Sequence, residues 1–374
     1  MIREIGRAIS EAQQTQWFGT VKFSCITTVF NEGKLLLRSV NSLLAQTHSD
    51  FELIIVADGS GPETLAILDT LADPRILIIR QANDGLSAAR NKALEQVSGD
   101  YVCFLDADDC RPTWALAAMA AKIAEEEPDL LFCRGSLSEV DGRLLPFYDT
   151  EQIMLAQERL SGGPANISQT DPETLALMHL IEPQVANKAV RADFLRQHGL
   201  WFPNGHFFED IYFHTMAIAA AERISILDVT CFTYFRRYQA QITAARGDTR
   251  FDVIGVARLT LEMFAKTAAF QSPLQRAAAL ASCAKLVRWC GDMISHHHRF
   301  AYSELAKVLF RNMDPAYADI PGKVGPGLTE IQRARDYMTA LGILDHFAHL
   351  ATSGERAHEP EGRSSLLRRL WAKR

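Results

Sequence analysis

The first third of the chain alternates short apolar runs with segments of helical spacing, and this alternation constrains the fold most strongly. Aliphatic and β-branched residues dominate four runs, at 21–29, 51–57, 75–80 and 101–105. Apolar residues at helical spacing separate these runs, at 34–46, 63–72 and 86–98. Nearly continuous apolar strands that alternate with helices are typical of a parallel sheet covered on both faces. We therefore predict an α/β fold with a mostly parallel, Rossmann-like sheet.

A helix is predicted at 113–126, and the chain is predicted to be mostly helical from residue 251 onward. Apolar residues recur three and four positions apart in several segments, at 113–126, 251–270, 272–297, 302–311 and 328–350. We accordingly expect an N-terminal extension (1–20), an α/β domain (21–245), a helical C-terminal appendage (246–350) and a flexible basic tail (351–374).

Composition excludes some classes of function. The net charge of −6 argues against a nucleic-acid-binding protein. The seven cysteines occur singly, which favours reduced thiols in a cytoplasm. The first residues lack the apolar core of a signal peptide, and no apolar run approaches the ~20 residues that span a bilayer. We expect a cytoplasmic protein.

The last residues leave two interpretations open. If SSLLRRLWAKR is helical, Leu366, Leu367, Leu370 and Trp371 lie on one side, opposite Arg368 and Lys373. Such a helix would contact an anionic membrane surface, placing the protein at the inner face of the membrane. A disordered basic tail is the alternative that we weigh more heavily.

Polar side chains follow three of the predicted strands. Ligands of open parallel sheets bind outside the carboxyl ends of the strands. Thr28, Phe30 and Glu32 lie at the end of the first strand, and Asp58 follows the second. FLDADDC follows the fourth strand with three carboxylates. No G-x-G-x-x-G or G-x-x-x-x-G-K-[ST] follows the first strand, so a nucleotide would need another counter-charge for its phosphates.

The carboxylates of FLDADDC suggest a cation site. Residues i and i+2 of an extended chain point to the same side, so Asp106 and Asp108 would face one site and Asp109 would point away. Carboxylate and phosphate oxygens suit Mg²⁺ or Mn²⁺. The alternative is that Asp109 caps a helix while the other two carboxylates are solvated.

The ordered segments SCITTVFNEG, SLLAQTHSDFELIIVADGS and NDGLSAARNKALEQVSGDYVCFLDADD resemble the inverting family 2 glycosyltransferases of the GT-A fold. The resemblance covers roughly residues 21–240. It implies a nucleotide-diphosphate-sugar donor, a hydroxyl acceptor and a divalent metal, Mn²⁺ or Mg²⁺.

The resemblance also implies roles for the residues that match the family motifs. Thr28, Phe30 and Glu32 fall on the nucleotide-binding turn, where the family usually has tyrosine in place of Phe30. Asp58 matches the second aspartate of Asp-Asp-Gly-Ser, whose first aspartate is replaced by Ala57. Arg90 lies near the donor, Asp106 faces the ribose and sugar, and Asp108 of the D-x-D binds the metal.

Three later segments complete the resemblance. FFEDIYF matches the family's Glu-Asp element, so Asp210 would be the catalytic base, with Glu209 beside the acceptor. Asn187-Lys188 resembles an element in which Lys188 faces the acceptor. In YFRRYQAQIT, Arg236 matches an arginine that would contact the donor diphosphate or the acceptor, and Gln241 replaces the usual serine. Without the resemblance, Glu209-Asp210 would be a helix cap and Arg236-Arg237 a solvated pair.

These matches predict an inverting transfer in bacterial polysaccharide or glycoconjugate synthesis, with a UDP-sugar as the expected donor. Asp210 would take the acceptor proton while the metal at Asp108 neutralises the departing diphosphate. Two alternatives remain. One is a nucleotidyltransferase on a related sheet, although its glycine-rich N-terminal loop is absent. The other is a non-catalytic protein that binds sugar nucleotides as a sensor or scaffold.

Overall fold

The computed structural model describes residues 21–160, 163–237 and 247–353. The predicted extension 1–20, the tail from residue 354 onward and Gln241 lie outside the described residues.

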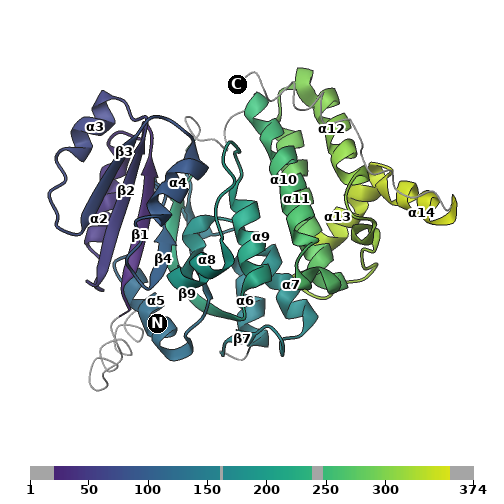
Figure 1. Cartoon of the computed structure of the whole chain (residues 1–374), viewed down its shortest axis with the longest axis horizontal. Coiled ribbons are helices and arrows are strands. Elements are labelled where there is room, and N and C mark those ends of the chain that lie inside the picture. The colour runs from purple at the N-terminus through teal and green to yellow at the C-terminus, as the bar shows by residue number, and fades with distance from the viewer. Residues whose placement is uncertain (1–20, 161–162, 238–246, 354–374) are drawn as a thin grey trace.

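Nine strands form one sheet, which crosses the left half of the molecule (Figure 1). The strand order is β3-β2-β1-β4-β8-β5-β9-β7, and β6 pairs with β5 beside this path. The strands are β1 (Phe23–Val29), β2 (Phe51–Asp58), β3 (Ile76–Gln81), β4 (Tyr101–Phe104), β5 (Leu130–Ser138), β6 (Leu144–Pro146), β7 (Ala165–Asn166), β8 (Lys188–Arg191) and β9 (Arg223–Phe235).

The first four strands confirm the predicted parallel sheet. β1 pairs in parallel with both β2 and β4, and β2 pairs in parallel with β3. β8 then runs antiparallel between β4 and β5, while β5 and β9 are again parallel. Because β1, β2 and β4 point the same way, their carboxyl ends meet at one edge, where the predicted site residues follow.

Helices cover both faces of the sheet, as predicted. The α-helices of this part are α2 (Leu35–Leu44), α3 (Pro62–Leu68), α4 (Leu86–Leu94), α5 (Ala115–Glu126), α6 (Thr150–Arg159), α7 (Pro172–Leu180), α8 (Ala192–His198) and α9 (Asp210–Ala220). One apolar core joins α2, α3 and α5 to one face, including Leu36, Leu68 and Met119. The second core joins α4 and α6–α9 to the other face.

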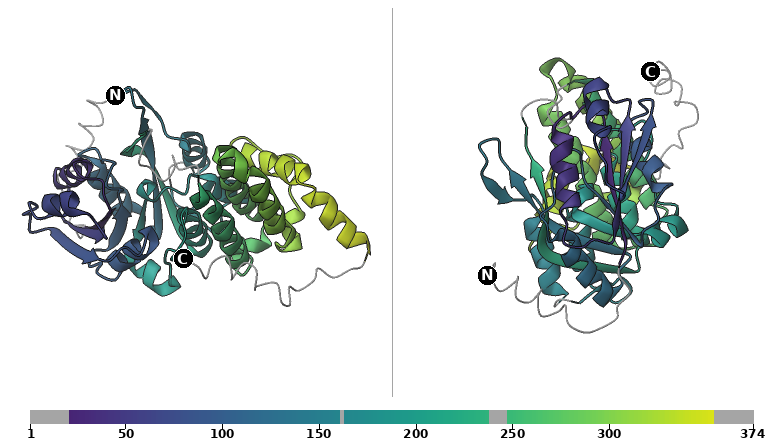
Figure 2. Two further views of the ribbon diagram at one scale, coloured as in Figure 1. Left: turned by 90° about the horizontal axis from the view of Figure 1, so that it is seen from above. Right: turned by 90° about the vertical axis from the view of Figure 1, so that its left-hand side faces the viewer.

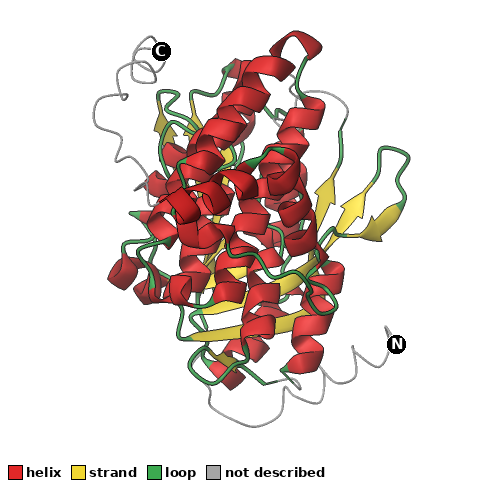
Figure 3. Cartoon of the chain, turned by 90° about the vertical axis from the view of Figure 1, so that its right-hand side faces the viewer, coloured by secondary structure: helices red, strands yellow, loops and turns green. Residues whose placement is uncertain are grey.

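The C-terminal region is helical, as predicted, and its helices are drawn in red in front of the strands when the molecule is viewed from that end (Figure 3). Its α-helices are α10 (Asp252–Phe264), α11 (Pro273–Met293), α12 (Arg299–Arg311), α13 (Thr329–Ala340) and α14 (Ile343–Ser353). Short 3₁₀ helices occur across the chain, namely η1 (Val185–Asn187), η3 (Asp248–Phe251), η4 (Ala268–Gln271), η5 (His296–His298) and η6 (Pro315–Ala318). The single helix expected at 328–350 is two helices, because Gly342 has a φ of 69° and interrupts the helical backbone.

The helical region shares the second core with the α/β part. α10 packs on α9, and α11 packs on α7 and α10. These contacts place the region beside the sheet as an elongated continuation of the molecule (Figure 2). Within the described ranges, no helix combines the length and the apolar character needed to cross a bilayer.

Candidate active site

The turn after β1 forms one wall of the site. Phe30 is 46% exposed, so its ring faces solvent. Its backbone N–H donates to Glu32 Oε2 at 2.7 Å. Burial raises the pKa of Glu32, and the nearby Asp108 carboxylate raises it further. Thr28 is half-buried at the end of β1.

Asp58 fixes the loop that leads into α4. Its buried carboxylate accepts hydrogen bonds from Gln81 Nε2 at 2.9 Å and from the backbone N–H groups of Asp84 and Gly85 at 2.8 and 2.9 Å. These contacts order the backbone between β3 and α4. The sequence suggested only a nucleotide contact for Asp58, and the structure adds this supporting role.

Arg90 brings together three carboxylates that lie far apart in the sequence. Its guanidinium, which is 2% exposed, contacts Asp106 at 3.0 Å, Glu209 at 2.5 Å and Asp210 at 2.6 Å. Asp106 follows β4, and Glu209 and Asp210 begin α9. Glu209 makes no side-chain cap bond, so the Glu-Asp pair serves the arginine rather than the helix end.

One guanidinium cannot neutralise three carboxylates, and burial shifts the pKa values of Glu209 and Asp106. Burial raises the pKa of Glu209 to about 8, despite its contact with Arg90. Burial also raises the pKa of Asp106 to about 6. Glu209 therefore holds its proton more tightly than an ordinary glutamate does. Glu209 is only 2% exposed, whereas the side chains of Asp106 and Asp210 are 32% and 28% exposed and reach the solvent side of the cluster.

The remaining aspartates of FLDADDC diverge. Asp108 forms an ion pair with Arg237, which follows β9. Asp109 points away from the site, as the sequence suggested, but it caps no helix, since α5 begins only at Ala115. Its buried carboxylate instead accepts from the backbone N–H of Phe235 at 3.0 Å. Burial raises the pKa of Asp109 well above its ordinary value.

Arg237 is a site residue that sequence reasoning did not select. The predicted Arg236 turns toward the hairpin of β5 and β6, where it contacts Glu139 at 2.8 Å and the hydroxyl of Tyr148. Neighbouring residues of an extended segment point to opposite sides, so only one of the two arginines can face Asp108. Side chains along β9 alternate between the two faces of the sheet, and this alternation was the signal that could have identified Arg237.

Lys188 lies beneath the site and is buried. Its ammonium donates to Asn187 Oδ1 at 2.7 Å and to the carbonyl of Gln184. Asn187 Nδ2 in turn donates to the buried Asp149 at 3.0 Å. Burial lowers the pKa of Lys188 to about 7 and raises the pKa of Asp149 to about 7. The structure therefore does not place Lys188 on an open acceptor surface.

The residues at this edge fit part of the coordination shell of a divalent cation, which a bound ligand would complete. Asp108 and Glu32 supply carboxylate oxygens close enough to influence each other electrostatically. Among the described residues, no three His, Cys, Asp or Glu side chains form a ready cation cage. Mg²⁺ sites often combine one or two carboxylates with substrate phosphates, and this donor set allows such a site.

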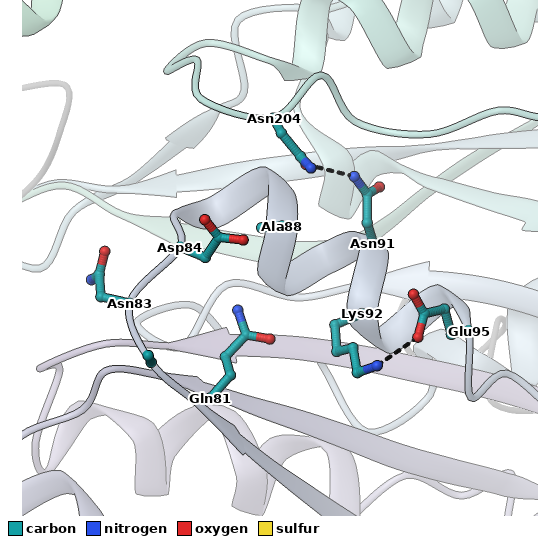
Figure 4. A pocket seen from close by; sticks show the side chains of 9 residues that line it. Gln81, Asn83, Asp84, Ala88, Asn91, Lys92, Glu95 and Asn204 are labelled. Atoms are coloured by element: carbon teal, nitrogen blue, oxygen red, sulfur yellow. Dashed lines mark hydrogen bonds and ion pairs between the residues drawn. The ribbon is translucent and has the colours of Figure 1, made fainter. Parts of the chain in front are cut away.

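A polar pocket of about 460 Å³ adjoins the Asp58 loop (Figure 4). It is lined by Gln81, Ala82, Asn83, Asp84, Ala88, Asn91, Lys92, Glu95 and Asn204. Asn91 bridges α4 to the loop before α9 by donating to Asn204 Oδ1 at 2.9 Å. No residue that the sequence predicted for the site lines this pocket, but Gln81 and Asp84 connect it to Asp58.

Comparison with known proteins agrees with this geometry. A model of the family described as "Glycosyl transferase family 2" matches residues 24–172, which hold β1 to β4 and the D-x-D. The chain resembles the family 2 glycosyltransferases. The solved structure of Staphylococcus aureus TarS 1–349 in complex with UDP-GlcNAc aligns with 90% of this chain and 93% of that chain. With a TM-score of 0.66 and 19% identity, it establishes the shared GT-A fold.

Two curated relatives of this family-2-like chain are similar over longer stretches. The Bacillus subtilis protein named as the uncharacterized glycosyltransferase EpsJ is 31% identical over 223 residues, covering 56% of this chain and 60% of that protein. The Staphylococcus aureus poly(ribitol-phosphate) beta-N-acetylglucosaminyltransferase TarS is 28% identical over 246 residues, which cover 64% of this chain and 40% of that protein. The chain thus spans less than two thirds of the length of either relative.

Proposed function

We propose that the chain is a glycosyltransferase that moves a sugar from a nucleotide-sugar to a hydroxyl acceptor in bacterial glycan synthesis. The contact of Arg90 with Asp106 and Asp210 carries this proposal. Asp210 lies 120 residues after Arg90, yet one guanidinium holds it beside the D-x-D. Such an arrangement suits a site where a donor held at the D-x-D meets an acceptor held near Asp210.

The donor is proposed to be a UDP-sugar. The S. aureus structure that shares the fold contains UDP-GlcNAc, and another structure of the same protein contains UDP. The exposed ring of Phe30 is available for stacking on a base, and Glu32 and Asp58 border the same edge. Arg237 is better placed than Arg236 to meet the diphosphate, because Arg236 is directed to Glu139 and Tyr148.

Asp210 is proposed to act as the base, with inversion at the anomeric carbon. It would accept the acceptor's hydroxyl proton as the new glycosidic bond forms. Glu209 suits this task less well, because it is only 2% exposed and burial raises its pKa. Arg90 holds the Asp210 carboxylate in place, and the buried Lys188 amine interacts electrostatically with it.

Asp108, with Glu32 nearby, is proposed to hold Mn²⁺ or Mg²⁺. When bound, the cation would neutralise negative charge on the departing diphosphate. Arg237 and Arg90 face the same edge of the sheet, and their positive charges would also help to neutralise the diphosphate. The cytoplasmic location remains a prediction. The contact of the tail with a membrane also remains a prediction, because the tail lies outside the described residues from 354 onward.

The first test is Asp210→Asn, which keeps an acceptor oxygen but removes the base. We expect hydrolysis or transfer from UDP-GlcNAc with Mn²⁺ to fall by ~10²–10⁴, the usual effect of losing a general base. Binding of UDP should change little, because Asp210 is assigned to the acceptor side. Asp108→Asn is the contrasting variant, in which cation-dependent binding of UDP should be lost. Full activity of Asp210→Asn would refute its role, and UDP binding by a wild-type chain that transfers no sugar would favour a non-catalytic binding protein.

A further inference from the structure

The residue before the Glu209-Asp210 pair has an unusual backbone conformation. Phe208 has a φ of 65°, in the left-handed region that glycine favours. Among the described residues other than glycine, only Glu127 shares a positive φ. A bulky residue persists in this region only where its surroundings hold it, and such residues cluster at functional sites.

The ring of Phe208 is held by the helical C-terminal region. It packs edge-to-face on Trp289 of α11, with ring centroids 6.1 Å apart and an interplanar angle of 86°. Trp289 is in turn fixed by Arg250, whose guanidinium carbon lies 4.3 Å from the centroid of the indole ring. Arg250 is fully buried and also donates to Cys290 Sγ at 3.4 Å. The ring that contacts Phe208 is therefore part of a packed wall.

Phe208 is covalently and structurally connected to the carboxylates of the site. Its carbonyl accepts the first hydrogen bond of α9, from the N–H of Ile211 at 3.4 Å. The carbonyl of Glu209 accepts from Tyr212 at 3.1 Å and from Phe213 at 3.3 Å. A rotation at Phe208 would consequently move the first turn of α9 and carry Asp210 away from its 2.6 Å contact with Arg90.

We propose that Phe208 and Trp289 form an aromatic clamp through which the helical region positions Asp210. Trp289 is then a positioning residue, since it touches Phe208 and not the reacting atoms. The clamp gives the helical region a role in transfer beyond covering the sheet. The catalytic part of this inference rests on the proposed function, in which Asp210 is the base.

The test compares variants of the full chain. Trp289→Ala removes the clamp on the side of α11. Phe208→Gly removes the ring but keeps a residue that tolerates the observed φ. Tyr337→Ala is the matched control, because Tyr337 and Phe310 form an edge-to-face pair with the same centroid distance of 6.1 Å and the same angle of 86°, inside the helical region.

We expect kcat with UDP-GlcNAc and Mn²⁺ to fall at least ~10-fold in both clamp variants, because small displacements of a catalytic group cost up to ~10²-fold. The affinity for UDP, measured by calorimetry, should stay within about twofold, since α9 is not the proposed donor wall. Trp289→Phe should restore most of kcat, and Tyr337→Ala should keep it. An unchanged kcat in the clamp variants, or an equal loss in the control, would overturn the proposal.

Hydrogen exchange tests the aromatic clamp without an assay of sugar transfer. The amides of Ile211, Tyr212 and Phe213 should exchange faster in Trp289→Ala and Phe208→Gly, and at the wild-type rate in Tyr337→Ala. If the wild-type chain transfers no sugar while this difference appears, the proposed function fails and the clamp stands. Equal exchange in all the variants would refute the clamp itself.

Discussion

At the scale of single residues, the site is defined by how its charges are paired. Arg90 meets three carboxylates, whereas Asp108 meets Arg237. The first group has more negative than positive side chains, and burial together with the neighbouring Asp210 carboxylate raises the pKa of Glu209. The second group is an ion pair that involves the proposed cation ligand. Arg90 therefore holds Asp210 in place, whereas Asp108 must exchange Arg237 for a cation.

Because Arg237 pairs with Asp108, a cation must compete with it. In Arg237→Ala, the affinity for Mn²⁺ without nucleotide should rise by up to ~5-fold, since a partly exposed ion pair contributes at most ~1 kcal/mol. Titration followed by electron paramagnetic resonance measures free Mn²⁺ directly. Arg236→Ala is the matched control, because Arg236 contacts Glu139 and Tyr148 instead. Unchanged or weaker Mn²⁺ binding in Arg237→Ala would show that the ion pair does not compete with the cation.

Lys188 should make stability depend on pH above neutrality. Burial lowers its pKa from 10.5 to about 7, so between these values the unfolded chain binds a proton that the folded chain lacks. The free energy of unfolding should therefore rise with pH in this window, by at most ~1.4 kcal/mol per unit. Urea unfolding at pH 7, 8 and 9 should show the wild type gaining stability relative to Lys188→Met. A constant difference across these pH values would contradict the shifted pKa.

At the scale of elements, the pairing of β5 with β9 decides which residues reach the site. The register shifts between Cys133 and Arg134 and again between Arg134 and Gly135. Beyond these shifts, β9 continues to Phe235, whose N–H binds Asp109, and then to Arg237. Gly135 pairs with Phe232 in this register, and the buried Phe232 ring lies over it.

Gly135→Ala should destabilise this pairing. A Cβ atom at residue 135 would lie 2.2 Å from Cζ of Phe232, which is fully buried and unable to withdraw. We expect a loss of ~1–3 kcal/mol in the free energy of unfolding, as for other overpacked cores. Gly247→Ala is the control, since its Cβ would meet no atom of the described residues within 4 Å, and it should change stability by less than ~0.5 kcal/mol. Equal stability of the two variants in urea unfolding would argue against a rigid contact.

The sequence predicted some elements better than others, for physical reasons. β1 to β4 were predictable because buried parallel strands are apolar along their whole length. β8 has only four residues, KAVR, and carries no such pattern, so its antiparallel insertion was not foreseen. Motif spacing suggested Asp106, Asp108 and Asp210 as site residues. It could not reveal that Arg90 joins two of them, because that contact depends on how β4 and α9 are brought together.

At the scale of the whole molecule, the helical region and the α/β part share one core. Residues of α10 and α11, such as Val256 and Leu280, belong to the same apolar cluster as Phe104 of β4 and Phe213 of α9. The boundary predicted at 245/246 remains a prediction, since it falls where the chain is outside the described residues. The shared core indicates that the two parts depend on each other.

Removal of the helical region should consequently harm the remainder. A chain that ends at residue 247 would expose the faces of α7 and α9 that α10 and α11 cover. Large exposed apolar patches promote association, so we expect a lower soluble yield and aggregation in size-exclusion chromatography. A monomeric truncated protein with the thermal stability of the full chain would show instead that the region is an independent module.

The position of β8 between β4 and β5 also affects the order in which the strands can pair while the chain is being synthesised. A ribosome releases β1, β2, β3 and β4 first, and these four strands are neighbours in the sheet, so they can pair with one another before β8 has been made. β5 follows, but it cannot join them until β8, which begins at Lys188, has emerged to lie between it and β4. Contacts that are distant in sequence form slowly, and nascent chains tend to fold from the N-terminal end. The D-x-D would accordingly be in place early in synthesis, and Asp210 would reach Arg90 only after most of the chain has been made.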